Sequence, residues 1–489
     1  MDVLLLDPGA ANAATWTIGL LRMPIKMALL QLQSFLLDRQ AAGEAALRGS
    51  RIAVCDLEWE LDQPNDPVAY AAYLDLARER LRGERFDLVA LSCWSSLKYR
   101  LSVSVAALVK ELNPEARIVV GGWHPSALPE DFLFDGSPFD WVVRSEGEHA
   151  LLDLIRDLAG GRPPARGVLE GRLVLPEEEV RLRWDAYPGA TTVPTAPLFF
   201  SRGCPFICSY CMEPYTKGQS WRALPPERAV DRVRHLLSTT RVKYIDVHDP
   251  IFAPQRAWRR AFFEGLGAMG FDRFMWTESR VDVFEEGDLA LFAGFDLQLD
   301  FGMETASADM LQIMRKTRAP GAYLKRARET LLAAARHDLT AQVYLITHHP
   351  GERLTQVKET LAFFEGVVAE MRRTSIIQVS AQPYRYYPGT AVNREGPRLF
   401  EAYGTVVDRP FWWREDTNMR DASACTVDTH LDPAERAAID EAWESGLSRI
   451  NTRLMERRSD RASRVLARRS ASYLDLALYR QRWVDARGG

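Results

Sequence analysis

The first third of the chain alternates short apolar runs with amphipathic segments. The apolar runs, which are typical of buried strands followed by turns, fall at 3–7, 51–56, 87–92, 117–122 and 141–143. Helical periodicity lies between them, at 26–40, 67–82 and 103–112. Continuous apolar strands that alternate with helices are typical of a parallel sheet covered on both faces. We therefore expect a doubly wound, Rossmann-like α/β domain over residues 1–158, with its ligand site at the carboxyl ends of the strands.

The pattern breaks after this domain and resumes near Leu198. Scattered prolines and poor periodicity predict a linker with room for one hairpin over 159–196. Six further strands are then predicted at 198–200, 244–247, 274–276, 297–301, 342–346 and 376–379. Six strand–helix units predict a partial (β/α)6 barrel of the TIM type over 197–395, with its chemistry at the carboxyl ends of the strands. Residues 396–489 are predicted to form a small, mostly helical C-terminal region.

Composition and charge exclude several classes of protein. The 489 residues are 47% hydrophobic and 26% charged, which is ordinary for a globular protein and excludes disorder, collagen and coiled coil. A net charge of −4 gives no global field for nucleic acid, and the Arg-rich stretch 453–469 is expected to be a solvated helix face. Arg22 and Lys26 interrupt the longest apolar stretch, and the N-terminus lacks the features of a signal peptide. We expect a cytoplasmic protein with no membrane or nucleic-acid partner.

Three of the six cysteines, Cys204, Cys208 and Cys211, lie within eight residues of one another, directly after a predicted strand. One loop can fold three thiolates at this spacing around an iron–sulfur cube or a zinc ion. Structural zinc needs four ligands, and no fourth Cys or His lies nearby in the sequence. A cube that keeps one iron open for a substrate is therefore favoured. Incidental core cysteines and a zinc site with a distant fourth ligand are the alternatives.

The Cys-x3-Cys-x2-Cys motif, with Tyr210 before its last cysteine, resembles the signature of radical S-adenosylmethionine (SAM) enzymes. The resemblance implies that the three cysteines hold a 4Fe–4S cluster whose open iron binds SAM. The reduced cluster would donate an electron into the sulfonium, and the protein would position that group and exclude water. An external electron donor such as flavodoxin or ferredoxin is also implied.

Residues at the strand ends of the barrel fit the same resemblance. Asp249 ends the second strand, where members of the family often carry an acidic residue facing the methionine moiety of SAM. Glu278 and Arg280 end the third strand, and Arg280 is expected to pair with the methionine carboxylate. Glu304 lies in a segment similar to the family's Gly-x-Glu-Ser and is expected to accept hydrogen bonds from the ribose hydroxyls.

His348 and His349 end the fifth barrel strand, near the expected position of the substrate. Successive side chains of a strand point to opposite sides, so at most one of the two faces the cavity. A catalytic base is the functional interpretation, and a structural hydrogen bond is the alternative.

Ahead of such a barrel, the first domain resembles the cobalamin-binding domain of cobalamin-dependent radical SAM enzymes. The positions carried over from the ends of its third, fourth and fifth strands are Ser92, Trp94, Gly121, Gly122, Trp123 and Glu146. Paired glycines let the backbone approach a bulky ligand, and the two tryptophans lie on loops suited to cap the corrin. Gly9 stands where many cobalamin proteins carry a cobalt-ligating histidine, so ligation from that loop is excluded. His124 as the cobalt ligand, and a domain that binds nothing, are the less favoured alternatives.

These resemblances together imply a cobalamin-dependent radical SAM enzyme, most directly a methyltransferase acting on a carbon centre in a biosynthetic pathway. One SAM would supply a methyl group through cobalamin, and a second would give the radical that removes a hydrogen from the substrate. Ring contraction, cyclisation or other hydrogen abstraction, with or without cobalamin, stays open because fold and cofactors do not fix the reaction. So does a non-catalytic metal- or cobalamin-binding sensor. The substrate is a small molecule or a peptide.

Overall fold

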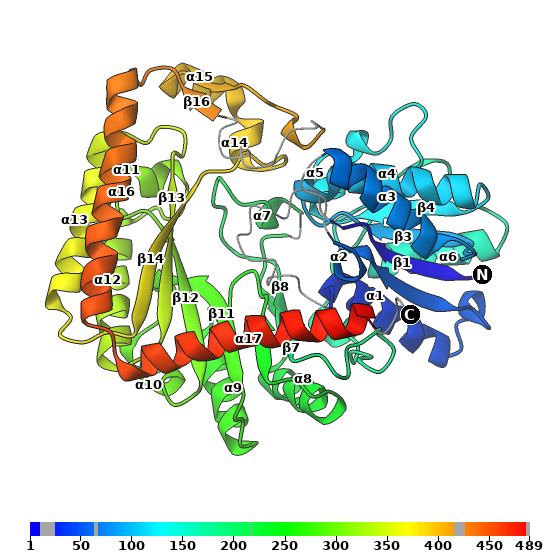
Figure 1. Cartoon of the computed structure of the whole chain (residues 1–489), viewed down its shortest axis with the longest axis horizontal. Coiled ribbons are helices and arrows are strands. Elements are labelled where there is room, and N and C mark those ends of the chain that lie inside the picture. The colour runs from blue at the N-terminus through cyan, green and yellow to red at the C-terminus, as the bar shows by residue number, and fades with distance from the viewer. Residues whose placement is uncertain (10–24, 63–66, 217, 415–425, 486–489) are drawn as a thin grey trace.

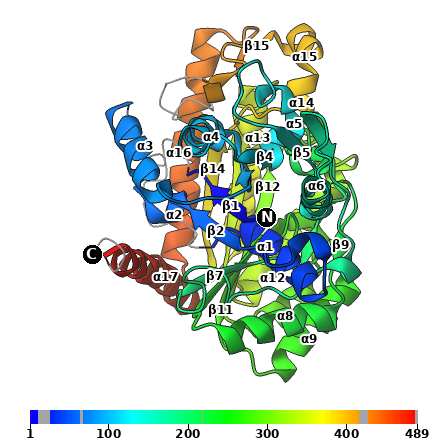
Figure 2. The same ribbon diagram turned by 90° about the vertical axis from the view of Figure 1, so that its right-hand side faces the viewer.

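Two six-stranded parallel sheets lie side by side in the chain (Figure 1). The structure is a computed structural model that describes residues 1–9, 25–62, 67–216, 218–414 and 426–485. Turned by 90°, the molecule shows the first domain in front of the barrel (Figure 2). Within the described residues, no helix combines the length and apolar character that crossing a bilayer requires.

The first sheet has the strand order β2-β1-β3-β4-β5-β6, so the order reverses at β1. Its strands are β1 (Val3–Asp7), β2 (Ile52–Asp56), β3 (Leu88–Ser92), β4 (Arg117–Gly121), β5 (Trp141–Arg144) and β6 (Gly167–Glu170). Helices α1 (Met27–Ala41) and α6 (Glu148–Ala159) cover one face, and α3 (Pro67–Leu81) and α4 (Tyr99–Leu112) cover the other. The predicted doubly wound domain is confirmed, and the reversal of strand order places a crevice at the carboxyl ends of its strands.

The segment predicted as a linker contributes to both sheets. Residues 167–170 form β6, which pairs with β5 in parallel as the sixth strand of the first sheet. Its side chains alternate between half-buried and exposed, so this edge strand carries little of the apolar signal that marks the others. Further on, Trp184 is fully buried. The barrel then begins at β7 (Thr195–Leu198), which is earlier than predicted. Pro197 lies within this strand, and the sheet tolerates the proline because β7 is an edge strand.

The second sheet forms the predicted partial barrel, with the strand order β14-β13-β12-β11-β10-β7. After β7 its strands are β10 (Tyr244–Val247), β11 (Phe274–Arg280), β12 (Leu297–Glu304), β13 (Ala341–Thr347) and β14 (Ile376–Pro383). The helices between them are α8 (Pro226–Thr239), α9 (Arg256–Ala268), α10 (Glu286–Phe292), α12 (Pro320–Arg336) and α13 (Leu354–Glu370), with a shorter α11 (Ala308–Ile313) after β12. Their apolar faces share one core with the inner helices of the first domain.

The C-terminal region braces both domains. After α15 (Gly396–Tyr403) and the antiparallel pair β15 (Thr405–Val407) and β16 (Thr426–Asp428), α16 (Pro433–Glu456) packs along α13 and β14. Helix α17 (Asp460–Asp485) then crosses in front of the lower part of the barrel in Figure 1 and reaches the first domain, where Tyr479 stacks on Trp59 with ring centroids 6.1 Å apart.

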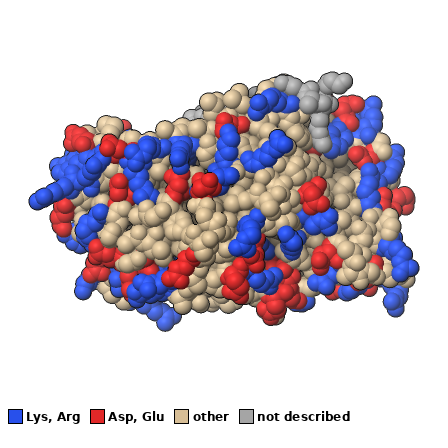
Figure 3. Space-filling view, turned by 90° about the horizontal axis from the view of Figure 1, so that it is seen from below, with Lys and Arg blue, Asp and Glu red and all other residues tan. Residues whose placement is uncertain are grey.

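The Arg-rich stretch is therefore more than a solvated helix face. Arg468 pairs with Asp296, and Arg461 donates to the carbonyls of Ala293 and Phe295 at the foot of the barrel. Seen from below, Lys and Arg side chains lie next to Asp and Glu side chains rather than forming a field of one sign (Figure 3).

Candidate functional site

The three clustered cysteines lie between the two stems of a short hairpin. Its stems are β8 (Ser201–Arg202) and β9 (Arg222–Ala223), which pair antiparallel with Arg202 opposite Arg222. Gly203 turns the chain out of β8 with a φ of +70°, a conformation that favours glycine. The Cys211 N–H donates to the Cys208 carbonyl at 3.2 Å, so the last two cysteines share one tight turn.

Asp249 fixes the beginning of this loop instead of facing a cofactor. Its carboxylate accepts the N–H groups of Phe200 at 2.6 Å and Ser201 at 3.3 Å, together with the Ser201 hydroxyl. The residue is 8% exposed, and burial raises its pKa to about 7. Three donors from the beginning of the cysteine loop thus contact its carboxylate, which gives Asp249 a structural role, and its predicted contact with SAM stays a prediction.

Arg280 ends β11, as predicted, and lies beside the cysteine loop. Its guanidinium stands 3.8 Å from the centroid of the Phe206 ring, and its Nη1 lies 3.8 Å from the Cys208 Sγ. Burial raises the pKa of the Cys204 and Cys211 thiols, so deprotonation needs nearby positive charge or metal. Asp282 holds this guanidinium at 2.9 Å. Its pairing with a methionine carboxylate stays a prediction.

Tyr210 and Glu304 meet in a buried polar group that also contains Lys316. The Tyr210 hydroxyl donates to Glu304 Oε1 at 2.6 Å, and the Lys316 ammonium lies 2.7 Å from the same oxygen. A register shift at the end of β12 and a φ of +66° aim the Glu304 side chain toward them. Sequence reasoning missed Lys316, which follows α11 and carries no motif. The expected contact of Glu304 with ribose stays a prediction.

Glu278 opens into the interior of the barrel from β11. The low-dielectric surroundings and the neighbouring Asp300 raise its pKa to about 7, whereas Arg469 of α17 acts in the opposite direction. Glu278 is nevertheless exposed to solvent in this structure. Its predicted part in cofactor binding stays a prediction.

The two histidines after β13 do not provide an open catalytic base. His348 has a φ of +58° and turns to α16, where its Nε2 lies 2.8 Å from the Asp440 carboxylate. His349 is 2% exposed, its Nδ1 donates to the Pro350 carbonyl at 3.0 Å, and its Nε2 lies 3.5 Å from the Ser209 hydroxyl. These contacts favour the structural alternative, since His348 pairs with α16 and His349 contacts the cysteine loop at Ser209, and the catalytic role of either histidine stays a prediction.

The neighbouring Glu352 predicts a pH dependence of stability. Its carboxyl accepts the His348 N–H at 2.7 Å and the Trp443 indole N–H at 3.2 Å, and burial raises its pKa from 4.5 to about 7. The folded state therefore keeps this proton to a higher pH than the unfolded chain does. Its contribution to stability is complete below the unfolded pKa of 4.5 and is lost as the pH rises through about 7.

Glu352→Gln keeps an acceptor oxygen but cannot ionise. We expect the variant to gain on the order of 2 kcal/mol relative to the wild type between about pH 5 and about pH 8, measured by urea unfolding. Glu365→Gln, on the exposed Glu365–Arg449 pair with an N–O distance of 3.2 Å, is the control and should follow the wild-type curve. Parallel pH profiles for Glu352→Gln and the wild type would contradict this account.

The loops that follow β3 and β4 in the first domain lie against each other. The Trp94 and Trp123 rings are 6.2 Å apart in an edge-to-face arrangement, and Trp94 is 43% exposed. A Cβ at Gly122 would stand 2.4 Å from the Cys93 carbonyl oxygen, at a φ of +124°. The glycine is therefore required by the contact between the two loops, so its expected ligand role is not needed to explain it.

Ser92 and Gly121 are the last residues of β3 and β4, and they pair with each other at the carboxyl edge of the first sheet. Ser92 is 9% exposed. Their contact with a ligand stays a prediction. His124 is fully buried, with Nδ1 2.7 Å from the Ser96 hydroxyl and Nε2 2.9 Å from the Asp131 carboxylate. Both ring nitrogens are occupied, which excludes His124 as a cobalt ligand.

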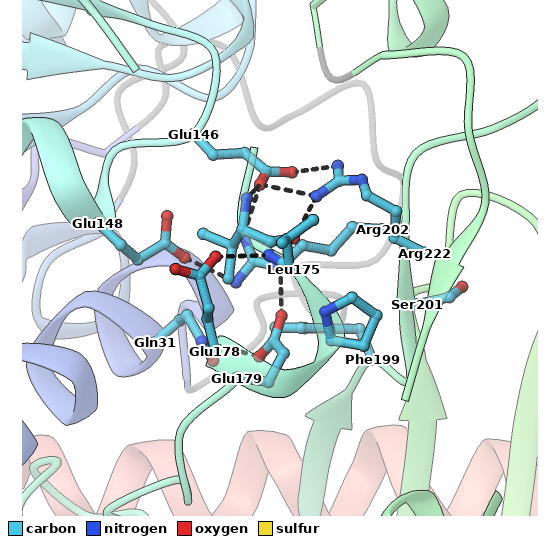
Figure 4. Close-up of polar contacts among 12 residues, drawn as sticks. Gln31, Glu146, Glu148, Leu175, Glu178, Glu179, Phe199, Ser201, Arg202 and Arg222 are labelled. Atoms are coloured by element: carbon cyan, nitrogen blue, oxygen red, sulfur yellow. Dashed lines mark hydrogen bonds and ion pairs between the residues drawn. The ribbon is translucent and has the colours of Figure 1, made fainter. Parts of the chain in front are cut away.

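Glu146 does not face the crevice. Its side chain is fully buried and accepts both Nη groups of Arg222, at 2.7 and 3.0 Å, and the Val174 N–H (Figure 4). Its carboxylate is filled by donors from the cysteine hairpin and the connecting segment, which gives Glu146 a structural role, and its predicted contact with the cofactor stays a prediction.

The donor sets fit the implied groups. In the described ranges, no three His, Cys, Asp or Glu side chains are grouped as ligands of one metal ion. A cube differs from a zinc ion in that it binds each thiolate through a different iron. At the edge of the first sheet, the buried atoms Asp7 Oδ2 and Trp123 Nε1 have no hydrogen-bond partner among the described residues. Such orphaned polar atoms are expected where a polar ligand covers the edge.

Comparisons with known proteins match the two halves of the chain separately. The family described as B12 binding domain matches residues 44–155, and the radical SAM superfamily matches residues 198–364. The chain is similar to an uncharacterized methyltransferase, PH0819, of Pyrococcus horikoshii, with 26% identity over 325 residues, covering 62% of this chain and 68% of that protein. It is also similar to hopanoid C-3 methylase of Methylococcus capsulatus, with 26% identity over 264 residues and 50% of each chain covered.

Among solved structures, the fold is similar to the radical SAM methyltransferase TsrM of Kitasatospora setae with cobalamin and a [4Fe–4S] cluster bound. That likeness has a TM-score of 0.62 at 15% identity and covers 92% of this chain and 88% of TsrM. TsrM with tryptophan substrate and a SAM analogue bound gives a TM-score of 0.61 at 14% identity and covers 92% of this chain and 97% of that chain.

The two matched families bring cobalamin, SAM and a 4Fe–4S cluster as cofactors, and the described residues fit them. A B12-binding domain is joined to a radical SAM barrel within one chain. The chain therefore belongs to the cobalamin-dependent radical S-adenosylmethionine enzymes.

Proposed function

We propose that this enzyme is a methyltransferase that transfers a methyl group from SAM to a carbon centre of a small molecule in a biosynthetic pathway. One observation carries the proposal. Helix α5 (Trp123–Ala127), which follows β4, packs against α7 (Glu213–Thr216), which follows Cys211. The edge of the cobalamin-binding domain and the cysteine loop therefore adjoin, as group transfer between their cofactors requires. The two methyltransferase relatives and TsrM support the same reaction class.

Each part of the proposed site has its own task. The three cysteines would hold the cluster, Arg280 and Glu304 would orient SAM, and Trp94 with Trp123 would cover the cobalamin edge. When bound, the cluster supplies the electron that cleaves SAM, and cobalamin carries the methyl group. We propose residues 1–170, extended by β6, as the cobalamin unit, 195–395, which begins with β7, as the barrel, and 396–489 as the brace.

A small organic molecule is the proposed substrate, supported by the tryptophan bound in TsrM. The proposed electron donor is an external flavodoxin or ferredoxin, because the cluster needs one electron for each cleavage of SAM.

The formation of S-adenosylhomocysteine tests the proposal without a known substrate. We expect anaerobically reconstituted enzyme with a low-potential reductant and SAM to release about one S-adenosylhomocysteine per chain, as the bound cobalamin takes up one methyl group. Protein reconstituted with the cluster alone is the control and should form none. Release of 5′-deoxyadenosine without S-adenosylhomocysteine from the fully reconstituted enzyme would contradict methyl transfer and favour other hydrogen-abstraction chemistry.

A further inference from the structure

The base of the cysteine hairpin brings two buried arginines together. Arg202 and Arg222 are register partners on β8 and β9, and their side chains are 12% and 8% exposed. Like charges directly opposite each other in an antiparallel pair are destabilising, and burial increases that cost. The hairpin therefore needs anions from another part of the chain to hold its two stems together.

The first domain supplies the central anion. Glu146 lies in the loop between β5 and α6. Its carboxylate accepts hydrogen bonds from Nη2 and Nη1 of Arg222 at 2.7 and 3.0 Å, and it lies 3.6 Å from Arg202 Nη1. One carboxylate thus touches both stems of the hairpin (Figure 4). A guanidinium held through two parallel bonds is fixed in orientation as well as in distance.

Two more carboxylates complete the network. Glu148, at the beginning of α6, lies 2.6 Å from Arg202 Nη2. Glu179, in the connecting segment, pairs with Arg202 Nε and lies 3.1 Å from Arg232 Nη2 on α8. Burial opposes its ionisation, but these two arginines still hold the pKa of Glu179 below its ordinary value. Three glutamates thus meet three arginines.

Stability alone does not explain this network. Buried ion pairs are weak stabilisers compared with well-packed apolar residues, and their best-attested use is to specify one geometry. Every ion pair named here except that of Glu179 with Arg232 links an acid outside the barrel to the two residues that close the cysteine loop. The contacts therefore fix where that loop sits relative to the cobalamin-binding domain.

We propose that Glu146, Glu148 and Glu179 are positioning residues that lock the cysteine loop against the first domain and thereby set the separation of the cluster from cobalamin. The inference rests on the cofactors of the proposed function but not on which group is transferred. Removing one carboxylate should leave both cofactor sites intact and loosen their relative placement.

The first test measures that separation directly. Wild type, Glu146→Gln and Glu179→Gln are reconstituted with cob(II)alamin and the reduced cluster, and pulsed EPR measures the distance between the two paramagnetic centres. We expect one narrow distance distribution in the wild type and a broadened or shifted one in both variants, at unchanged iron and cobalt content. Glu178→Gln is the matched control, because Glu178 pairs with Arg172 and His149 on the first-domain side and does not reach the hairpin.

A second readout needs no cofactor. Hydrogen exchange of residues 203–216 should be at least about tenfold faster in Glu146→Gln than in wild type or Glu178→Gln, since local opening follows lost contacts. If Glu146→Gln does not fold, Arg222→Lys replaces it with the same expectation. This variant keeps the positive charge but loses the paired hydrogen bonds from the guanidinium to Glu146. Wild-type distance distributions and exchange rates in these variants would overturn the inference. A wild type that binds no cobalamin would overturn the proposed function, while the exchange comparison would still decide the inference.

Discussion

Cys208→Ala is expected to remove the iron–sulfur cluster and all reductive cleavage of SAM. Cys208 is the buried member of the three cysteines, and its thiol lies 3.8 Å from the Arg280 guanidinium. A loop left with two thiolates cannot hold a cube that already lacks a fourth protein ligand. Iron content should fall from about four atoms per chain to near zero, and 5′-deoxyadenosine should fall below detection. Elemental analysis and product chromatography after anaerobic reconstitution measure both.

Cys93→Ala provides the matched control. Cys93 is also fully buried but lies in the first domain, where its thiol contacts the Ser95 carbonyl at 3.5 Å. This variant should keep its iron. Full iron content in Cys208→Ala would mean that the cluster is not held by this motif.

Lys316→Met is expected to destabilise the barrel by about 3–5 kcal/mol, because it leaves the buried Glu304 carboxylate without its cation. Lys316 is 4% exposed and lies 2.7 Å from Glu304 Oε1 and 3.0 Å from the Gly302 carbonyl. Urea unfolding of the protein without cofactors measures the loss. The same variant should weaken SAM binding, because Glu304 would lose its fixed orientation.

Two further variants make the cause visible. Lys325→Met removes an exposed lysine on α12 and should change stability by less than about 0.5 kcal/mol. The double variant Lys316→Met with Glu304→Gln should recover part of the loss, since no buried charge is then unpaired. A Lys316→Met protein as stable as Lys325→Met would show that the pair does not stabilise the fold.

Most of the fold is predictable from the sequence because parallel strands buried on both faces leave continuous apolar runs. Strands such as β1 and β3 are buried at every position, and their runs stand out from the helices around them. The edge strand β6 lacks that signal, because half of its side chains face solvent. The brace formed by α17 was also missed, since periodicity shows that a helix exists but not what it crosses.

The candidate site is predictable only where chemistry is carried by a motif. The spacing of the cysteines marks their loop, which includes Tyr210, and the strand-end residues Arg280 and Glu304 contact that loop. Strand-end position alone does not give the role of Glu146 or Asp249, because a buried acid at a strand end also serves as an anchor for neighbouring donors. No local pattern distinguishes the two roles, which are decided by contacts far apart in the sequence.

The most direct test of the account is the metal content of the wild-type chain after anaerobic reconstitution with iron, sulfide and cobalamin. We predict about one cobalt and about four irons per chain, with the visible spectra of both cofactors. Iron without cobalt would contradict the cobalamin assignment and with it the proposed methyl transfer, and cobalt without iron would contradict the radical SAM assignment.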